Sequence, residues 1–449
     1  MEIVVTLRFK NYALACLVLA LFCQTSVAFA QRQSPVIAYL TDVEGKWQKF
    51  ADFLKDNPHV FFNGGGKLKL ADGVTFVYGG DATDSGPNNA EVVDQLIRLK
   101  KRYPARVILL AGNRDIGKLD LDSFLVRPLT PKLLDRLQKE GLSDTRTGRV
   151  KLLCELLGYP GAFDDRKAEL ALLKGRSVSD DDVTSQMIAD IRPGGRQRVY
   201  LEKSQLMYRN GETLFVHGAV LDDNLGVVGN SQAHAYAQVE DWMRDLNQWY
   251  AQQINEWEKT GDASELVKYG KPVPGTFQNR ASVVVGRYTD ASGNSRMPSR
   301  HLIEYLKENG IRRIVVGHTP QGDGPTILRE NGFEIIVADN TDAPHGSKLF
   351  ITGHEVEVES KVRLPNGEET YQMKWAIDDD TPLGHRLASS DHLLKAKLKN
   401  GSWLTFQVGP PPDFEVEHRV ISQDEVLRIG VKVNSNRFFD GLCAMVFGN

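Results

Sequence analysis

Five short apolar runs constrain the possible fold of this chain most. Each run leads into a short phrase of small, acidic or imidazole residues. Apolar runs bounded by Gly, Asp and Asn predict buried strands. In open α/β sheets, ligands bind beyond the carboxyl ends of the strands, so side chains placed there are expected to converge. The phrases lie at Thr41, Gly79, Gly112, His217 and His318. The sequence therefore predicts one site built from five strand ends.

The polar side chains of these phrases form a set of metal-ligand types. Such a set is large for one cation and suits two, with the carboxylate of Asp81 shared between them. Mixed oxygen and imidazole donors are typical of paired Mn²⁺, Zn²⁺ or Fe sites. The competing interpretation, in which the acidic residues are ordinary caps and turn residues, requires five independent coincidences. The predicted ligands are Asp42, Glu44, Asp81, Asn113, His217 and His318.

In this order the five phrases resemble the motifs of the calcineurin-like metallophosphoesterases. The wording Gly80-Asp81-x-x-Asp84-x-Gly86 is nearest to the protein-phosphatase and diadenosine-tetraphosphatase branch. The resemblance spans roughly residues 35–345, although the five phrases alone carry it. It implies an α/β fold, namely a metallophosphoesterase-type β-sandwich flanked by helices. It also implies hydrolysis of phosphate esters, by attack of a hydroxide that bridges two divalent metal ions.

Glu44 is the first departure from the family pattern, which usually has a histidine at this position. A carboxylate is still a metal ligand, so the metal site is expected to survive. Because a carboxylate is harder than an imidazole, we expect Mn²⁺ or Mg²⁺ to be favoured, with Fe or Zn²⁺ as alternatives.

Arg114 is the second departure, because it stands where the family usually has a catalytic histidine. A guanidinium stays protonated, so it cannot serve as a general acid. It can bind phosphate oxygens and stabilise developing charge. The branch's Asp-Arg-Gly reads Asp84-Ser85-Gly86 here, so we expect Arg114, oriented by Asp84, to replace a lost phosphate-binding arginine. Arg287 lies between the two histidine phrases, where the phosphatase branch of the family often has another phosphate-binding arginine. This part of the resemblance rests on one residue.

The pattern along the chain predicts a domain over residues 31–345 that is interrupted by a helical insertion at 119–203. Within the insertion, helices are expected from Pro131, over Val150 to Leu157, and over Ser179 to Ile191. The insertion is either a packing cap or a lid that selects substrates. Residues 346–449 predict a small antiparallel β region, and alternation at 414–420 and 427–433 predicts two strands there.

Residues 1–30 have the pattern of a signal peptide. Arg8 and Lys10 precede an apolar run that ends at Cys23, and Ala28-Phe29-Ala30 provides a cleavage site. We expect the mature protein to be periplasmic or secreted, without a stable membrane span after cleavage. An uncleaved anchor is the alternative, although the run is short for a bilayer.

Two cysteines, Cys154 and Cys443, remain after cleavage of the predicted signal peptide, and we expect them to be free thiols rather than a disulfide. The formal net charge of −3 provides no electrostatic footprint for nucleic acid. The expected partner is a phosphorylated small molecule or phosphoprotein substrate.

The loss of the histidine acid leaves other functions open. The main hypothesis is a metal-dependent phosphoesterase. One alternative is a catalytically weakened protein that binds metal and phosphate, and another is a nucleotide or dinucleotide polyphosphate hydrolase.

Overall fold

The computed structural model describes residues 35–432, except residues 341, 342, 344, 366, 389 and 410–414. The predicted signal peptide, residues 1–30, and Cys443 lie outside the described residues. Cys154 is buried and has no disulfide partner among the described residues. Among the described residues, no helix combines the length and apolar character needed to cross a membrane.

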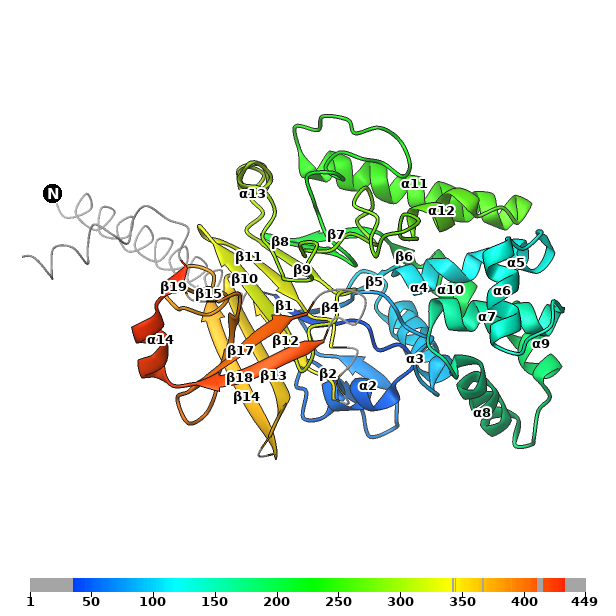
Figure 1. Cartoon of the computed structure of the whole chain (residues 1–449), viewed down its shortest axis with the longest axis horizontal. Helices are drawn as coiled ribbons and strands as arrows, with labels where there is room; N and C mark the ends of the chain where they lie inside the picture. The colour runs from blue at the N-terminus through cyan, green and yellow to red at the C-terminus, as the bar shows by residue number, and fades with distance from the viewer. Residues whose placement is uncertain are drawn as a thin grey trace, which may run out of the picture. The chain divides into compact units, whose positions relative to one another are not determined.

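The largest sheet has seven strands, and its parallel half carries the first three phrases (Figure 1). Its four parallel strands are β1 (Val36–Leu40), β4 (Val74–Tyr78), β5 (Val107–Leu110) and β6 (Ser204–Gln205). Three antiparallel strands extend it beyond β1, in the order β12 (Lys348–Thr352), β13 (Glu355–Leu364) and β14 (Gly367–Ala376). The antiparallel strands of the C-terminal third therefore begin as part of the main sheet.

A second sheet of five strands carries the two histidine phrases. In spatial order its strands are β10 (Thr326–Glu330), β11 (Phe333–Val337), β9 (Arg313–Val316), β8 (Thr213–Val216) and β7 (Met207–Asn210). β7 and β8 form an antiparallel hairpin that turns at Asn210-Gly211, a pair of residues typical of tight hairpin turns. β8, β9 and β11 are parallel, so their carboxyl ends lie at one edge.

The predicted β-sandwich flanked by helices is confirmed by the way each strand divides its side chains between two cores. On β1, Ile37 and Tyr39 point into the core between the two sheets, where the Tyr39 and Phe215 rings stack with centroids 5.8 Å apart. Ala38 and Leu40 point the other way, into the core shared with the helices. Because both faces are buried, the strands read as continuous apolar runs.

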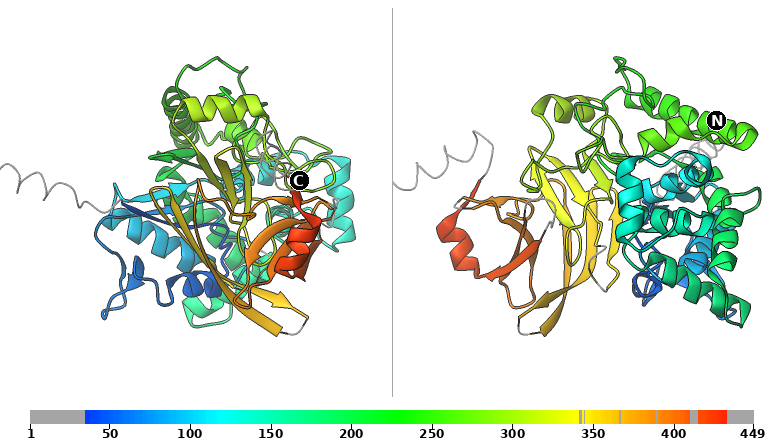
Figure 2. Two further views of the ribbon diagram at one scale, coloured as in Figure 1. Left: turned by 90° about the vertical axis from the view of Figure 1, so that its left-hand side faces the viewer. Right: turned by 45° about the vertical axis from the view of Figure 1, so that its right-hand side comes forward.

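Helices before and within the insertion cover the parallel half of the main sheet, and Figure 2 shows the insertion helices gathered on one side of it. Two helices precede the insertion, α2 (Trp47–Leu54) and α3 (Asn89–Arg102). From β5 to β6 the chain forms α4 (Asn113–Gly117), the 3₁₀ turn η1 (Lys118–Asp120), α5 (Leu121–Val126), α6 (Pro131–Lys139), α7 (Arg146–Leu157), α8 (Ala162–Lys174), α9 (Asp180–Asp190) and α10 (Arg196–Glu202).

The sequence pattern predicts α6, α7 and α9 but misses α5, α8 and α10 of the insertion. In α8 the leucines Leu172 and Leu173 are exposed while Glu169 is buried, so its apolar residues form no single stripe. Glu169 accepts a hydrogen bond from the backbone N–H of Ala90 at 2.6 Å, which fastens the insertion to α3. The insertion therefore packs against α3, and both of its expected roles, packing cap and substrate-selecting lid, stay predictions.

Three helices flank the second sheet: α11 (Val239–Thr260), α12 (Ser264–Tyr269) and α13 (Arg300–Glu308). Trp242 and Trp257 of α11 are buried, so this helix turns an apolar face with two tryptophans toward the core. A short hairpin of β2 (Val60–Phe62) and β3 (Leu68–Leu70) contains the glycine-rich turn.

The last described strands form a separate antiparallel sheet, which we call the C-terminal sheet. In spatial order it contains β18 (Val416–Ile421), β17 (Trp403–Val408), β16 (Leu393–Lys397), β15 (Arg386–Leu387) and β19 (Val431–Lys432). The strand predicted at 427–433 is wrong at residues 427–429, which end the helix α14 (Gln423–Ile429), whereas Val431–Lys432 is the strand β19. The side chain of Ser422 caps this helix by accepting from the Glu425 N–H at 3.1 Å.

Candidate metal centre

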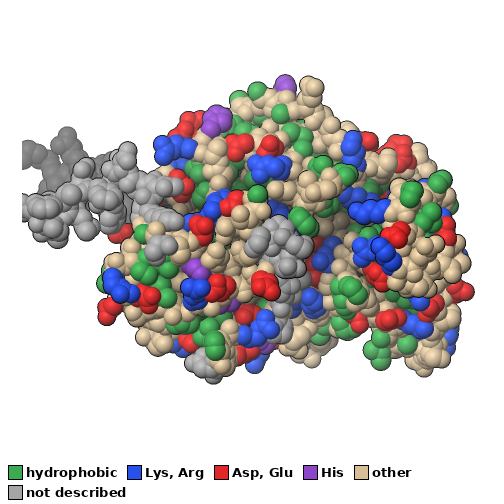
Figure 3. Space-filling view, viewed as in Figure 1, with side chains coloured by type: hydrophobic (Ala, Val, Ile, Leu, Met, Phe, Trp, Pro, Cys, Tyr) green, Lys and Arg blue, Asp and Glu red, His purple; other side chains and the backbone are tan. Residues whose placement is uncertain are grey.

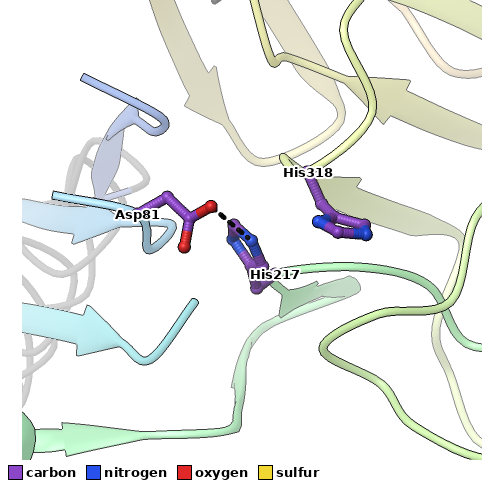
Figure 4. A group of neighbouring side chains, drawn as sticks. All are labelled: Asp81, His217 and His318. Carbon is purple, nitrogen blue, oxygen red and sulfur yellow. Dashed lines mark ion pairs between the residues drawn. The ribbon is translucent and has the colours of Figure 1, made fainter. Parts of the chain in front are cut away.

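The predicted metal ligands all lie at or just beyond strand ends, and the structure brings them together. Asp42 follows β1, Asp81 follows β4 and Asn113 follows β5, while His217 and His318 follow β8 and β9. Figure 4 shows Asp81 and the two histidines, which come from three different strands, facing a common space. The sandwich therefore gathers these side chains from residues more than 270 positions apart, as the contact between Asp42 and His318 shows.

Residues with a left-handed backbone conformation are concentrated at the predicted metal site. Seven described non-glycine residues have a positive φ, and five of them belong to the predicted site. Left-handed backbone at such residues costs on the order of 1–3 kcal/mol each and persists where the surroundings hold it. The five are Asp42 (φ 49°), Glu44 (53°), Asp81 (52°), Asp84 (96°) and His318 (64°).

Glycines allow the strand ends to approach one another closely. A Cβ on Gly112 would collide with the carboxylate of Asp81, and one on Gly317 would collide with the carboxylate of Asp42. These two glycines belong to the phrases that carry Asn113 and His318, so they let two strands enter the site side by side.

Two groups of donor atoms share Asp81. Asp42, Glu44 and Asp81 place one carboxylate oxygen each within 4.8 Å of one another. Asp81, His217 and His318 do the same with one oxygen and two nitrogens. All of these side chains are buried.

Asn113 belongs to the second group. Its Oδ1 lies 3.1 Å from Nε2 of His217, and that nitrogen lies 3.5 Å from Oδ2 of Asp81. The other ring nitrogen of His217 lies 2.8 Å from the carbonyl oxygen of Gly79. With Nδ1 donating to this carbonyl, Nε2 is the nitrogen that faces Asp81 and Asn113.

His318 completes the second group. Its ring lies beside that of His217, with centroids 5.2 Å apart. Nε2 of His318 is buried and has no hydrogen-bond partner among the described residues. The His318 backbone N–H lies 3.2 Å from Oδ2 of Asp42, and Arg287 donates from Nη1 to the His318 carbonyl at 3.0 Å. Arg287 therefore holds the backbone of a predicted ligand, and its contact with substrate stays a prediction.

Arg114 lies against the first group of donors. Its Nε is 3.1 Å from Oε1 of Glu44 and 3.7 Å from Oδ2 of Asp81, and its Nη1 donates to Ser85. We expected Asp84 to orient it, but the carboxylate of Asp84 pairs with Lys118 at 2.6 Å. Glu44 and Ser85 are therefore the groups that hold the guanidinium.

The sequence profile of the calcineurin-like phosphoesterases matches residues 35–322, which include all five phrases. The chain belongs to this family. No match is found among curated protein sequences.

Solved structures of phosphatases resemble this calcineurin-like phosphoesterase at a distance. The cold-active protein-tyrosine phosphatase of a psychrophilic Shewanella species is 16% identical, with a TM-score of 0.42, covering 75% of this chain and 80% of that one. A protein serine/threonine phosphatase from Saccharomyces cerevisiae is 12% identical, with a TM-score of 0.36, covering 78% and 83%. A metallophosphoesterase from Sphaerobacter thermophilus is 11% identical, with a TM-score of 0.29, covering 75% and 88%. These likenesses are too distant to indicate a substrate.

Asp115 is a residue of the calcineurin-like phosphoesterase site that the sequence reasoning did not assign. It is fully buried, and its Oδ2 accepts from the backbone N–H groups of Asp81 at 2.8 Å and Gly112 at 2.9 Å. Its Oδ1 accepts from the N–H of Ala82 at 3.2 Å. Asp115 thus fixes the second phrase against the third. Its position in the Gly-Asn-Arg-Asp phrase is the signal that could have identified it.

Lys49 and Asp339 are two further charged residues near the ligands. Lys49 of α2 is buried and donates from Nζ to the carbonyl oxygen of Asp42 at 2.8 Å. Asp339 is buried just beyond β11, and it is the charged neighbour that raises the pKa of Asp42 most, after the effect of burial. Asp339 also follows an apolar run, so the rule that identified the other strand ends could have found it.

Burial shapes the electrostatics of the first group. It raises the pKa of Asp42 well above its usual range, with Asp339 adding to the effect. Burial also raises the pKa of Glu44 to about 7, although Arg114 opposes this shift. Carboxylates that resist ionisation when crowded and buried are groups that a cation would stabilise.

The second group contains an ion pair. Burial acts to raise the pKa of Asp81, but His217 and Arg114 outweigh it and lower the pKa. Burial acts to lower the pKa of His217, but Asp81 outweighs it and raises that pKa to about 10. The pKa of His318 lies well below its usual range because of burial, with Arg287 and His217 adding to the effect. His318 is therefore a neutral imidazole, the form that binds metals.

These residues fit divalent cations. The donors are carboxylate, amide and imidazole groups, and the buried nitrogen of His318 lacks a partner among the described residues. Oε2 of Glu44 is likewise buried without a hydrogen-bond partner in the described part of the chain, with only Lys46 as an ion pair at 3.8 Å. Unpaired buried polar atoms are costly, so both atoms are suited to ligate a cation.

Proposed function

We propose that the protein is a metal-dependent phosphoesterase with a dinuclear site, in which Asp42, Glu44 and Asp81 hold one cation. Asp81, Asn113, His217 and His318 would hold the other. The observation that carries the proposal is the sharing of Asp81 between two groups of ligand atoms. When bound, two divalent cations would lower the pKa of a water molecule between them and neutralise phosphate oxygens.

Arg114 would bind the substrate phosphate. Its guanidinium lies beside both donor groups, and Glu44 and Asp81 outweigh burial and raise its pKa, so it stays charged. A fixed positive charge at this place can bind equatorial phosphate oxygens and stabilise charge that develops during in-line displacement. Arg287 is a second candidate for phosphate binding, because its guanidinium is adjacent to His318.

The substrates would be phosphate esters with good leaving groups. Arg114 occupies the position at which the family usually has a histidine that protonates the leaving group. Because a guanidinium does not give up its proton at ordinary pH, an alcohol with a low pKa would depart more readily than an alkyl alcohol. Such substrates include phosphorylated small molecules and phosphoproteins that present aryl esters.

A turnover assay with an aryl phosphate and Mn²⁺ tests the proposal. We expect the mature protein, residues 31–449, to hydrolyse it steadily and to bind two Mn²⁺ per chain by elemental analysis. Asp81→Ala should abolish turnover and metal binding, whereas Asp135→Ala, on an exposed face of α6, should change neither. Turnover that survives Asp81→Ala would contradict the proposal.

The second candidate is a protein that binds metal and phosphate with little turnover. The replacement of the histidine acid by Arg114 favours it. Two bound Mn²⁺ and measurable phosphate affinity, together with negligible hydrolysis of aryl phosphates, would select this candidate. A nucleotide or dinucleotide polyphosphate hydrolase differs only in substrate, and a screen that includes these compounds would identify it.

The location of the protein, periplasmic or secreted, is also a proposal. The pattern of residues 1–30 supports export to the periplasm or the medium, where the substrate would be encountered.

A further inference from the structure

Lys395 is a buried lysine that the proposed reaction does not use. It lies on β16 of the C-terminal sheet, and its side chain has no exposed surface. Nζ donates to the carbonyl oxygen of Gln321 at 2.5 Å and lies 3.4 Å from Nε2 of His418. It also lies 4.5 Å from the centroid of the Phe406 ring. Burial of an ammonium group is costly, so its acceptors are expected to serve a purpose.

Gln321 connects Lys395 to the turn that follows His318. Its side-chain amide donates to the carbonyl oxygens of Thr319 and Pro320, both at 3.0 Å. Its backbone N–H donates to the carbonyl oxygen of Asp339 at 2.8 Å. The ammonium group of Lys395 therefore holds the residue that ties this turn to the end of β11.

The turn needs to be held because His318 has a left-handed backbone, with φ of 64°. Asp42 holds the N–H of His318, and Arg287 holds its carbonyl. The residues after His318 are held by Gln321, and Gly322 packs so closely against His418 that a Cβ would lie 3.1 Å from its ring. Three contacts from different parts of the chain thus fix one strained ligand.

A second clamp holds the same loop from β13. Oδ2 of Asp323, two residues after Gln321, accepts from the backbone N–H of Arg363 at 3.0 Å, and the Arg363 side chain pairs with Oδ1 at 3.2 Å. The pKa of Lys395 falls to about 7 because of burial, and the nearby Asp323 opposes this shift. The loop therefore lies between two basic side chains, Arg363 of the main sheet and Lys395 of the C-terminal sheet.

We propose that Lys395 is a positioning residue for the metal ligand His318. Through Gln321, the C-terminal sheet fixes the orientation of an imidazole that ligates one of the two cations. The proposal rests on the metal site proposed above. It assigns the C-terminal sheet a part in metal affinity, because outer contacts that orient ligands typically change affinity by 10–100-fold.

Lys395→Met removes the charge and the donor while keeping the length of the side chain. The matched control is Lys397→Met, two residues along the same strand, where the lysine is exposed. We expect calorimetric titration with Mn²⁺ to show that Lys395→Met weakens one of two binding events about tenfold or more. Lys397→Met should titrate like the wild type. The thermal midpoint of the metal-free Lys395→Met protein, compared with that of the metal-free wild type, shows whether the variant folds, because the change leaves the carbonyl of Gln321 without its donor.

Gln321→Ala keeps the backbone carbonyl that Lys395 contacts but removes the links to Thr319 and Pro320. It should weaken the same binding event, which keeps the proposal testable even where Lys395→Met does not fold. Wild-type Mn²⁺ affinity in Lys395→Met, or in Gln321→Ala, would overturn the proposal. A wild-type protein that binds two Mn²⁺ without turnover would contradict the proposed phosphoesterase function, and the Mn²⁺ affinities of the variants would still decide the role of Lys395.

Discussion

Nε of Arg114 and Oε1 of Glu44 lie 3.1 Å apart, so the two residues that depart from the family pattern are each other's partners. A histidine pair is replaced by a cation and an anion, which leaves the sum of their formal charges at zero. Each residue depends on the other, because the guanidinium stabilises a buried carboxylate and the carboxylate holds the guanidinium in place.

Metal preference should depend on Glu44. A carboxylate is a harder ligand than imidazole, so we expect Mn²⁺ or Mg²⁺ to activate the wild type more than Zn²⁺. Glu44→His should improve relative activity with Zn²⁺, measured as the ratio of kcat/KM for the two metals. The same ratio in both proteins would show that Glu44 does not ligate the metal.

Arg114→Ala should lower turnover on the order of 10²-fold, because one group that stabilises developing charge is lost. KM for an aryl phosphate should rise as well. Arg114→Lys keeps the charge but not the planar guanidinium group, so its turnover is expected to lie between those of the wild type and Arg114→Ala. Full activity in Arg114→Ala would restrict this residue to a structural role.

Arg114→His belongs to the same test. Alone, it leaves Glu44 without its guanidinium partner, so we expect the single variant to lose activity. Together with Glu44→His, it restores two imidazoles. The activity of the double variant should therefore be higher than the two single-variant effects predict when they are multiplied. It should also gain activity on alkyl phosphates, which need a protonated leaving group. Additive effects of the two changes would mean that the ion pair has no influence on the reaction.

Glu44 should make a contribution to the free energy of unfolding of the metal-free protein that falls as pH rises from about 4.5 to about 7. The pKa of Glu44 is about 7 in the folded chain, above its ordinary value of 4.5, so the folded state binds more protons in this range. One such proton changes the free energy by up to about 1.4 kcal/mol per pH unit. Urea unfolding in EDTA measures the slope. Glu44→Gln should reduce it, and added Mn²⁺ should stabilise the wild type by mass action.

Asp115→Ala should destabilise the protein by on the order of 3 kcal/mol or more, because it leaves three buried N–H groups without their acceptor. Asp115→Asn keeps one carbonyl oxygen and should cost less. Chemical unfolding of the metal-free proteins gives the comparison, with the exposed Asp135→Ala as the control. A cost for Asp115→Ala no greater than that of the control would contradict the positioning role.

Export should remove residues 1–30. The cleavage pattern at Ala28-Phe29-Ala30 precedes the first strand, β1, which starts at Val36. N-terminal sequencing of the exported protein is expected to begin at Gln31. A chain that begins at Met1 would make this segment an anchor.

Local patterns predicted the strand ends well, because the side chains of Asp42, Asp81 and His217 are adjacent in sequence to the apolar runs that place them. The same patterns missed Lys49 and Lys395, because a lysine reads as a solvated charge unless its burial is known. Residues 427–433 alternate in polarity like a strand, yet the cap at Ser422 starts a helix that includes Leu427 to Ile429. Local periodicity does not include such competition between caps and pairing.

Local sequence patterns also did not predict which strands pair with each other in the sheets. Nothing near β12 indicates that it pairs with β1, more than 300 residues earlier. Likewise, the interspersed acidic and basic side chains of the face in Figure 3 give no sign of the charged residues gathered beneath the surface. Long-range pairing depends on the whole chain, whereas an apolar run depends on a few neighbours.

The position of β12 matters for the order in which a ribosome makes this protein. All six predicted ligands have been synthesised once His318 is added, but the edge of β1 stays open until β12 emerges. A nascent chain at that stage exposes unpaired N–H and C=O groups behind Asp42, which favour aggregation or pairing with another chain. A gene truncated at residue 322, where the family profile ends, would therefore encode every predicted ligand but not the strand that pairs with the edge of β1.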